Sequence, residues 1–145
     1  MILEIQKGGN NPILKEKTTS VKSISEEIVV LAKDMIETMI KNEGLGLSAN
    51  QVGKNIRMFV VHPDLTRRPI FINPEITKTS KRTDVLEEGC LSLPGIYRPV
   101  NRTKSIKIKA LNQKGKQFKL KANDLLARVI QHEIDHLNGI LITDK

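Results

Sequence analysis

The chain has little cysteine, few aromatic residues and no apolar run approaching the ~20 residues that a membrane-spanning helix needs. Its one thiol, Cys90, excludes an internal disulfide framework and suits a reducing compartment. The start of the chain, Met1–Glu4, has no basic segment followed by an apolar one, so we expect no secretory or transit peptide. Three phenylalanines and one tyrosine are too few to indicate base-stacking platforms for nucleic acid.

What is present is typical of a folded globular protein. Of the 145 residues, 39% are hydrophobic and 28% are charged, a balance that separates the chain from disordered proteins. We find no internal repeat, low-complexity stretch or long Pro/Gly/Ser linker, and therefore expect one domain spanning 1–145.

Positive charge is concentrated in one segment. Between Asn101 and Ala122 the chain has basic residues and no acidic one, while the formal net charge of the whole chain is +8. The basic residues are Arg102, Lys104, Lys107, Lys109, Lys114, Lys116, Lys119 and Lys121. The segment is either a contact surface for an anionic partner such as RNA or a solvated hairpin face whose lysines oppose aggregation.

Two helices are expected. Over 25–42 the apolar residues recur with helical spacing; they are Ile28, Leu31, Ala32, Met35, Ile36, Met39 and Ile40. Ser23 with Glu26 indicates a capping box at its start, and Gly44 indicates its end. A second helix is predicted from the N-cap Asn123 to about Asn138, and its apolar residues cover most of its circumference, which is typical of a buried helix.

The middle of the chain is predicted to form strands. Ile56–Val61 and Ile70–Ile72 are rich in β-branched residues, and Asn73-Pro74 indicates a turn after the second of them. Apolar residues alternate with lysines over 106–110 and again over 118–122. The intervening Asn112–Gly115 favours a turn, so these segments predict a β-hairpin with its lysines outward.

The second helix carries the most informative motif, His132-Glu133-Ile134-Asp135-His136. Residues four apart share a helix face, so His132 and His136 can direct two imidazole nitrogens at one metal ion. Glu133 follows the first of them, where a carboxylate can act as general base toward a metal-activated water. Without a metal, burying these polar groups would be costly.

A third ligand and an amide donor are available elsewhere. Cys90, in Glu87–Ser92, would complete a set of two histidines and one thiolate with a position left open, as in catalytic sites. The Gly-rich stretch Gly44–Gly53 allows close backbone approach, and Gln51 within it offers an amide that could stabilise an oxyanion. Taken alone, that stretch is equally consistent with a helix end followed by a loop.

These three segments, Gly44–Gln51, Glu88–Ser92 and Gln131–His136, taken in order, resemble the motifs of the peptide deformylases. The resemblance extends through Phe71–Glu75 and the hairpin and covers essentially the whole chain. It implies an α+β fold in which antiparallel sheets surround the metal-bearing helix. It also implies hydrolysis of the N-formyl group from the initiator methionine of nascent polypeptides.

The resemblance also implies roles for individual residues. Cys90, His132 and His136 would bind one divalent metal, Fe²⁺ in the cell, with Zn²⁺, Ni²⁺ or Co²⁺ possible after purification. Glu133 would be the general base, while the Gln51 side chain and the Leu91 backbone N–H would meet the oxyanion. The remaining candidates would contact substrate: Leu45, Leu125 and Val129 as walls of the methionine pocket, Gly46 and Gly89 as backbone partners, and Glu88 as a further lining residue.

Several expectations are more local. Asp135 is predicted to hold a basic group such as Arg102, and Tyr97 and Arg98 are candidates for contacts with the second or third substrate residue. Ser48 stands where bacterial members of the family often have alanine, and we expect little effect because both are small. We further expect a monomer in the cytoplasm, or in the cytoplasm of a bacterial host if the protein is virus-encoded.

The end of the chain departs from many bacterial members. Only nine residues follow His136, whereas those members continue into a C-terminal helix that docks on the ribosome. The chain therefore resembles the short form of some virus-encoded members, or is truncated, and the basic segment 101–122 could replace the missing helix as a ribosome contact.

Two other functions compete with this one. Another HExxH metalloenzyme, such as a zinc endopeptidase, usually takes its third ligand from a downstream Glu or His, and neither type follows His136. A non-catalytic domain that only binds peptides or RNA would not need Gln51, Cys90 and Glu133 together. Replacing Glu133 by alanine separates these possibilities, because only an enzyme would keep its metal and lose turnover.

Overall fold

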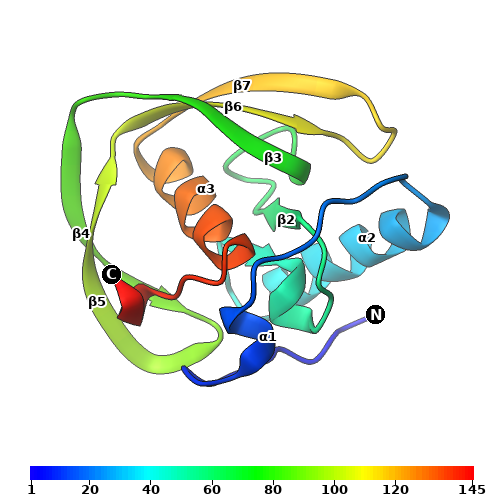
Figure 1. The fold of residues 1–145 in the computed structure, drawn as a ribbon, viewed down its shortest axis with the longest axis horizontal. Coiled ribbons are helices and arrows are strands. Elements are labelled where there is room, and N and C mark those ends of the chain that lie inside the picture. The colour runs from blue at the N-terminus through cyan, green and yellow to red at the C-terminus, as the bar shows by residue number, and fades with distance from the viewer.

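The computed structural model describes all 145 residues, and helix α3 (Asp124–Leu137) lies at its centre, with the other elements around it (Figure 1). A five-stranded antiparallel sheet has the order β1-β2-β3-β6-β7, and β4 and β5 form a separate antiparallel pair. The strands are β1 (Gly46–Ser48), β2 (Met58–Val61), β3 (Ile70–Thr79), β4 (Thr83–Cys90), β5 (Leu93–Thr103), β6 (Ser105–Leu111) and β7 (Gln117–Asn123). The expected α+β class is confirmed.

The core has two main parts, on opposite faces of the five-stranded sheet. Phe59 and Val61 of β2 belong to the apolar cluster shared with α3, while their neighbours Met58 and Val60 belong to the cluster shared with helix α2 (Glu26–Lys41). Because successive residues of a strand point to opposite faces, this burial on both sides places the sheet between the two helices. The site-bearing helix is thus held firmly against the sheet.

Both predicted helices are present, with small differences at their ends. Helix α2 is capped by Ser25, whose hydroxyl accepts from the backbone of Ile28, so the predicted capping box of Ser23 with Glu26 is wrong. At its C-terminus Glu43 takes the left-handed conformation, with φ 58°, and the Gly44 N–H donates to the carbonyl of Met39. Helix α3 begins after Asn123 and ends before Asn138, as expected.

The predicted hairpin is confirmed as β6 and β7, but the turn predicted at Asn73-Pro74 is wrong. Strand β3 continues through these residues to Thr79, and its register with β6 shifts between Ile72 and Glu75. Asn73 absorbs the irregularity at φ 50°, and its side-chain amide exchanges two hydrogen bonds of 2.8 Å with the backbone of Val21. A turn-forming pair can therefore also produce a bulge inside a long strand.

Three short elements complete the fold: α1 (Pro12–Lys15) and the 3₁₀ turns η1 (Ala49–Val52) and η2 (Ile142–Asp144). Strand β1 and turn η1 both lie within the Gly-rich stretch Gly44–Gly53. A smaller apolar cluster that includes Leu14, Leu93, Val100 and Leu141 joins α1, β5 and the C-terminal segment. None of the helices is both long and apolar enough to cross a membrane.

Candidate metal site and substrate cavity

The three predicted metal ligands come from two elements that are distant in sequence. Cys90 is the last residue of β4, immediately before the turn to β5, and His132 and His136 lie one helical turn apart on α3. Each offers one ligand atom, and these atoms all lie within 4.8 Å of one another. The Nε2 atom of His136 is 3.3 Å from Cys90 Sγ and 3.0 Å from His132 Nε2.

This donor set fits a divalent metal ion. Two imidazole nitrogens and a sulfur converge on one point, and thiolate and imidazole are ligands that suit iron, zinc, nickel or cobalt. The other ring nitrogen of His132, Nδ1, lies 2.9 Å from Glu88 Oε1, a contact that fixes the ring and leaves Nε2 facing the sulfur. The residues therefore form a site that could hold a metal with three protein ligands.

Glu88 is the centre of a buried ionic network rather than a simple lining residue. Arg102 donates to both of its carboxylate oxygens, at 2.7 and 2.9 Å, and Arg128 donates to Oε2 at 2.6 Å. Burial by itself would raise the pKa of Glu88, but the hydrogen bonds from His132, Arg102 and Arg128 hold that pKa far below its usual range. Glu88 is therefore anionic beside the first histidine.

The expected contact between Asp135 and Arg102 is present, and a second arginine was not anticipated. Arg102 Nη1 donates to Asp135 Oδ2 at 2.8 Å, which ties the helix to β5. Arg128 is 6% exposed and also donates to the Val100 carbonyl and to Asp84. Its charge among the apolar residues that flank it, Ala127 and Val129, was the available signal, since a buried arginine requires an anionic partner.

Glu133 lies on the buried side of the same helix, next to the Gly-rich stretch. Its Oε1 has no hydrogen-bond partner within the protein, and burial raises the pKa of this carboxyl to about 7. A Cβ built on Gly46 would come within 2.7 Å of Glu133 Oε2 and 2.9 Å of Val129 Cγ1. Only glycine at this position therefore leaves the carboxylate where it is.

The side-chain amide of Gln51, on turn η1, faces the thiol of Cys90. Its Nε2 donates to Ser92 Oγ at 3.1 Å and approaches Cys90 Sγ at 3.5 Å, while its Oε1 accepts from the Ser48 N–H at 3.0 Å. Gln51 itself is 2% exposed. Turn η1 thus holds a fixed N–H donor beside the converging ligand atoms.

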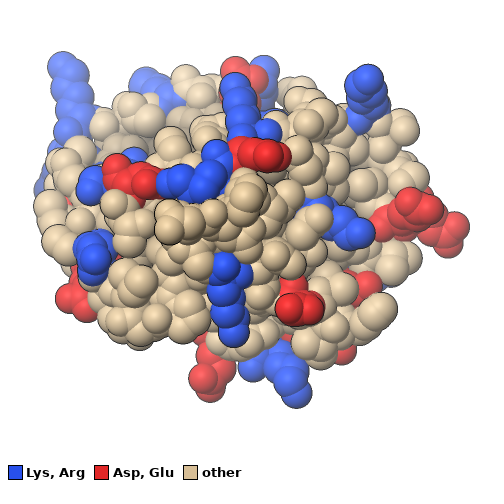
Figure 2. Space-filling model, turned by 60° about the horizontal axis from the view of Figure 1, so that its bottom comes forward, with Lys and Arg blue, Asp and Glu red and all other residues tan.

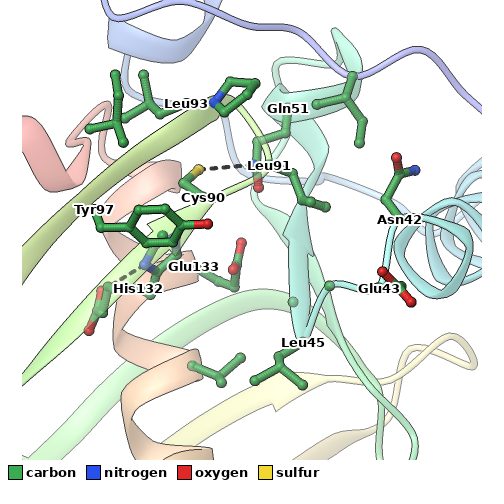
Figure 3. A pocket seen from close by; sticks show the side chains of 18 of the residues that line it. Asn42, Glu43, Leu45, Gln51, Cys90, Leu91, Leu93, Tyr97, His132 and Glu133 are labelled. Atoms are coloured by element: carbon green, nitrogen blue, oxygen red, sulfur yellow. Dashed lines mark hydrogen bonds and ion pairs between the residues drawn. The ribbon is translucent and has the colours of Figure 1, made fainter.

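A cavity of about 720 Å³ opens onto these groups (Figure 3). Cys90, His132, Glu133, Gln51 and Leu91 line it, and His136 lies beneath them, 1% exposed. All six residues named as substrate contacts also line it: Leu45, Gly46, Glu88, Gly89, Leu125 and Val129. The structure thus brings the twelve candidate residues to one place.

The cavity wall also includes residues that the sequence did not predict, and only one of the two further candidates, Tyr97 and Arg98, lines it. Ile2, Leu3 and Ile5 line the cavity from the N-terminal segment, which the sequence gives no reason to place there. Tyr97 also lines it, and its ring covers Gly89 so closely that a Cβ there would meet it at 2.7 Å. Arg98 instead is exposed and donates to the Tyr97 carbonyl.

Three convergent metal-binding atoms, a buried carboxylate, a fixed amide donor and an adjoining cavity are together typical of a metal-dependent hydrolase. Comparison with known proteins specifies the family. The family model for polypeptide deformylase matches residues 2–145. Peptide deformylases of Dictyoglomus turgidum and Clostridium botulinum are 50% and 49% identical, over 100% and 97% of this chain and 93% and 94% of their own lengths.

Solved structures agree with this assignment. The peptide deformylase of Thermotoga maritima superposes with a TM-score of 0.94 at 40% identity, over 100% of this chain and 97% of that one. The Synechococcus elongatus enzyme, solved in complex with actinonin, gives 0.92 at 37% identity, over 98% of this chain and 77% of that one. The chain therefore belongs to the peptide deformylases, metal-dependent hydrolases that remove the N-formyl group from nascent polypeptides.

Proposed function

We propose that Cys90, His132 and His136 hold one divalent metal ion, Fe²⁺ in the cell, and that residues 1–145 act as one catalytic unit. The observation that supports this most directly is the convergence of the three ligand atoms within 4.8 Å at the end of the cavity. When bound, such an ion supplies Lewis-acid activation of a water molecule and of the formyl carbonyl. Metals other than iron can occupy a set of two histidines and a cysteine, so Zn²⁺, Ni²⁺ or Co²⁺ can take its place in the purified protein.

Glu133 is the proposed general base, which transfers a proton during the hydrolysis. Its carboxylate, buried at the cavity wall with Oε1 free of protein partners, accepts a proton from the attacking water and returns it to the departing amine nitrogen. Gln51 Nε2 and the Leu91 backbone N–H donate to the oxygen of the formyl group as negative charge develops there. The fixed position of the Gln51 amide beside Cys90 supports this assignment.

The cavity walls select methionine. Leu45, Leu125 and Val129 present apolar surface beside Glu133, and fully burying a methionine side chain is worth roughly 1.5–3 kcal/mol. Gly46 and Gly89 bring backbone groups to the peptide, and Glu88 closes the cavity beside His132. Actinonin, which is bound in the S. elongatus structure, is accordingly expected to compete with formyl-Met peptides here.

Formate release from a formyl-Met tripeptide tests these roles. The protein would be purified anaerobically with ferrous iron, and Glu133→Ala would be assayed beside it. We expect release that disappears in the variant while its metal content stays at one ion per chain. Absence of bound metal in the wild type would overturn the assignment of Cys90, His132 and His136, and retained turnover in the variant would overturn that of Glu133.

We also propose that the outer face of the β6–β7 hairpin contacts ribosomal RNA. Lys107 lies directly opposite both Lys121 and Lys78, while Lys109 lies between Lys119 and Glu75 and forms an ion pair of 3.4 Å with the latter. Like charges in register across a sheet are destabilising, so this arrangement is better suited to an anionic partner than to stability alone. By contrast, the face drawn in Figure 2 intersperses acidic and basic side chains around a broad uncharged area.

Co-sedimentation with ribosomes at increasing salt tests this contact. The triple variant Lys107→Glu/Lys119→Glu/Lys121→Glu is expected to weaken binding and to flatten its salt dependence, because fewer counterions are released. The matched control changes three exposed lysines elsewhere, namely Lys22, Lys33 and Lys54, to glutamate. Equal loss in both triple variants, or binding that salt does not affect, would contradict the proposal.

The remaining proposals concern the oligomeric state of the protein and its compartment in the cell. We propose a monomer, in which the candidate site is complete without a residue from a second copy. Its substrate is made by ribosomes and its single thiol needs reducing conditions, both of which favour the cytoplasm, of a bacterial host if the protein is virus-encoded. Sedimentation velocity of the metal-loaded protein tests whether it is a monomer.

A further inference from the structure

Ser48 lies at the end of β1 and is completely buried, with its hydroxyl directed at two amide side chains. Its Oγ is 2.7 Å from Asn50 Oδ1 and 2.9 Å from Gln51 Oε1. On size alone, serine and alanine would be interchangeable here. These contacts instead give the hydroxyl a specific place between two carbonyl oxygens.

The positions of Asn50 Oδ1 and Gln51 Oε1 are fixed by the other hydrogen bonds that these two side-chain amides make. Asn50 Nδ2 donates to the carbonyl of His136 at 2.7 Å, so its oxygen must point the other way. Gln51 Oε1 accepts from the Ser48 N–H, and its Nε2 is directed at Ser92 Oγ and Cys90 Sγ. Neither amide can turn over without losing a buried partner, so only a donor fits between the two oxygens.

We propose that Ser48 is a positioning residue for the reaction, which acts by fixing the Gln51 amide relative to the metal ligands. Its hydroxyl links Gln51 to Asn50, and Asn50 is anchored on the backbone of His136 in α3. The oxyanion donor and the metal-bearing helix are thereby joined through one buried group. This inference rests on the proposed role of Gln51 as oxyanion donor.

Removing the hydroxyl has a defined consequence. In Ser48→Ala the two carbonyl oxygens would face each other across a buried gap, and Asn50 Oδ1 would lose its only donor in the protein. The two oxygens carry like partial charges and repel each other, so the Gln51 amide would move away from the position that it now holds beside Cys90. The loss should fall on the transition state, where the amide acts, and not on peptide binding.

The test is a double-mutant cycle between Ser48 and Gln51, measured by formate release from the metal-loaded protein. We expect Ser48→Ala to lower kcat by about tenfold, the upper range for one hydrogen bond, with KM within about twofold of wild type. In the Gln51→Ala background the same substitution should change kcat by less than about twofold, because the group through which Ser48 acts is gone.

Controls separate this role from general stability. Thr18→Val removes another buried hydroxyl, whose partners Leu137 and Arg57 lie outside the cavity, and should lower the melting temperature while leaving kcat unchanged. Metal content is measured for each variant. If Ser48→Ala does not fold, Ser48→Cys takes its place in the cycle, since a thiol is similar in size and a much weaker donor.

The outcomes are distinguishable. An equal fall in kcat in both backgrounds, or a rise in KM alone, would overturn the positioning role of Ser48 and leave the proposed role of Gln51 intact. Full activity in Gln51→Ala would overturn both. A large effect of Ser48→Ala that disappears in the Gln51→Ala background supports both.

Discussion

Arg128 donates a hydrogen bond of 2.6 Å to Oε2 of Glu88, the carboxylate whose other oxygen lies 2.9 Å from His132 Nδ1. The arginine and the histidine are one helical turn apart on α3, and Glu88 reaches both from β4. A residue with no direct contact to the ligand atoms is therefore connected to them through one buried carboxylate. Such indirect support commonly affects metal affinity by 10- to 100-fold, roughly.

The first prediction follows from this network. Arg128→Met should lower the free energy of unfolding by about 3 kcal/mol, because the buried Glu88 keeps only one of its two arginines. Urea unfolding of the metal-loaded protein measures this loss.

Arg102→Ala should have a larger effect on stability and also lower metal affinity, since Arg102 contacts both Glu88 and Asp135. Unchanged metal content and activity in Arg102→Ala would contradict the role of that residue.

A second prediction concerns the ligand from β4. Cys90→Ala should leave the protein folded but reduce bound metal from one ion per chain to a small fraction, because two histidines alone make an incomplete site. Elemental analysis after dialysis gives the ratio. Ser92→Ala, two residues further along, is the comparison that should retain the metal. Equal metal content in the two variants would remove Cys90 from the ligand set.

A third prediction addresses substrate choice. Leu125→Ala removes apolar wall from the cavity and should lower kcat/KM for a formyl-Met peptide by about tenfold, a loss of roughly 1.4 kcal/mol of transition-state binding. A formyl-Ala peptide does not reach that wall and should be affected little. Leu86→Ala is the matched control, because Leu86 is similarly exposed but lies outside the cavity. A similar loss with both peptides would argue against Leu125 as a specificity residue.

A fourth prediction concerns the irregular strand β3. Asn73→Ala should cost about 2 kcal/mol of stability, since the variant loses two hydrogen bonds to Val21 and keeps a backbone angle that suits asparagine better than alanine. Chemical denaturation is the measurement, with the exposed Asn55→Ala as control. A change within about 0.5 kcal/mol would show that the bulge does not depend on the side chain.

The parts of the fold that were predictable have one strongly periodic face. The helix containing Met35 and the hairpin with alternating lysines bury one side only, so hydropathy reveals them. Strands β4 and β5 have no such periodic face. They pair only with each other, most residues of β4 are exposed, and apolar and polar residues do not alternate along it. The Asn73-Pro74 pair was misinterpreted because the same residues favour a turn and a bulge.

The candidate site divides in a similar way. Metal-ligand spacing is local, so the positions of His132, Glu133 and His136 on one helix could be predicted from the sequence. The pairing of Arg102 with Asp135 was also expected and is present. The approach of Ile2 to the cavity and of Arg128 to Glu88 depends on tertiary contacts across the whole chain, which no local pattern encodes.

Gly46 has a consequence for how this protein can vary over evolution. Any side chain there would collide with Glu133 and Val129, so all single-nucleotide changes of its codon that alter the residue should be removed by selection. Leu45 and Leu125, both about half exposed at the same cavity, carry no such restriction. New substrate preferences, or escape from an inhibitor, are therefore expected to arise at the rim of the cavity, while its floor stays fixed.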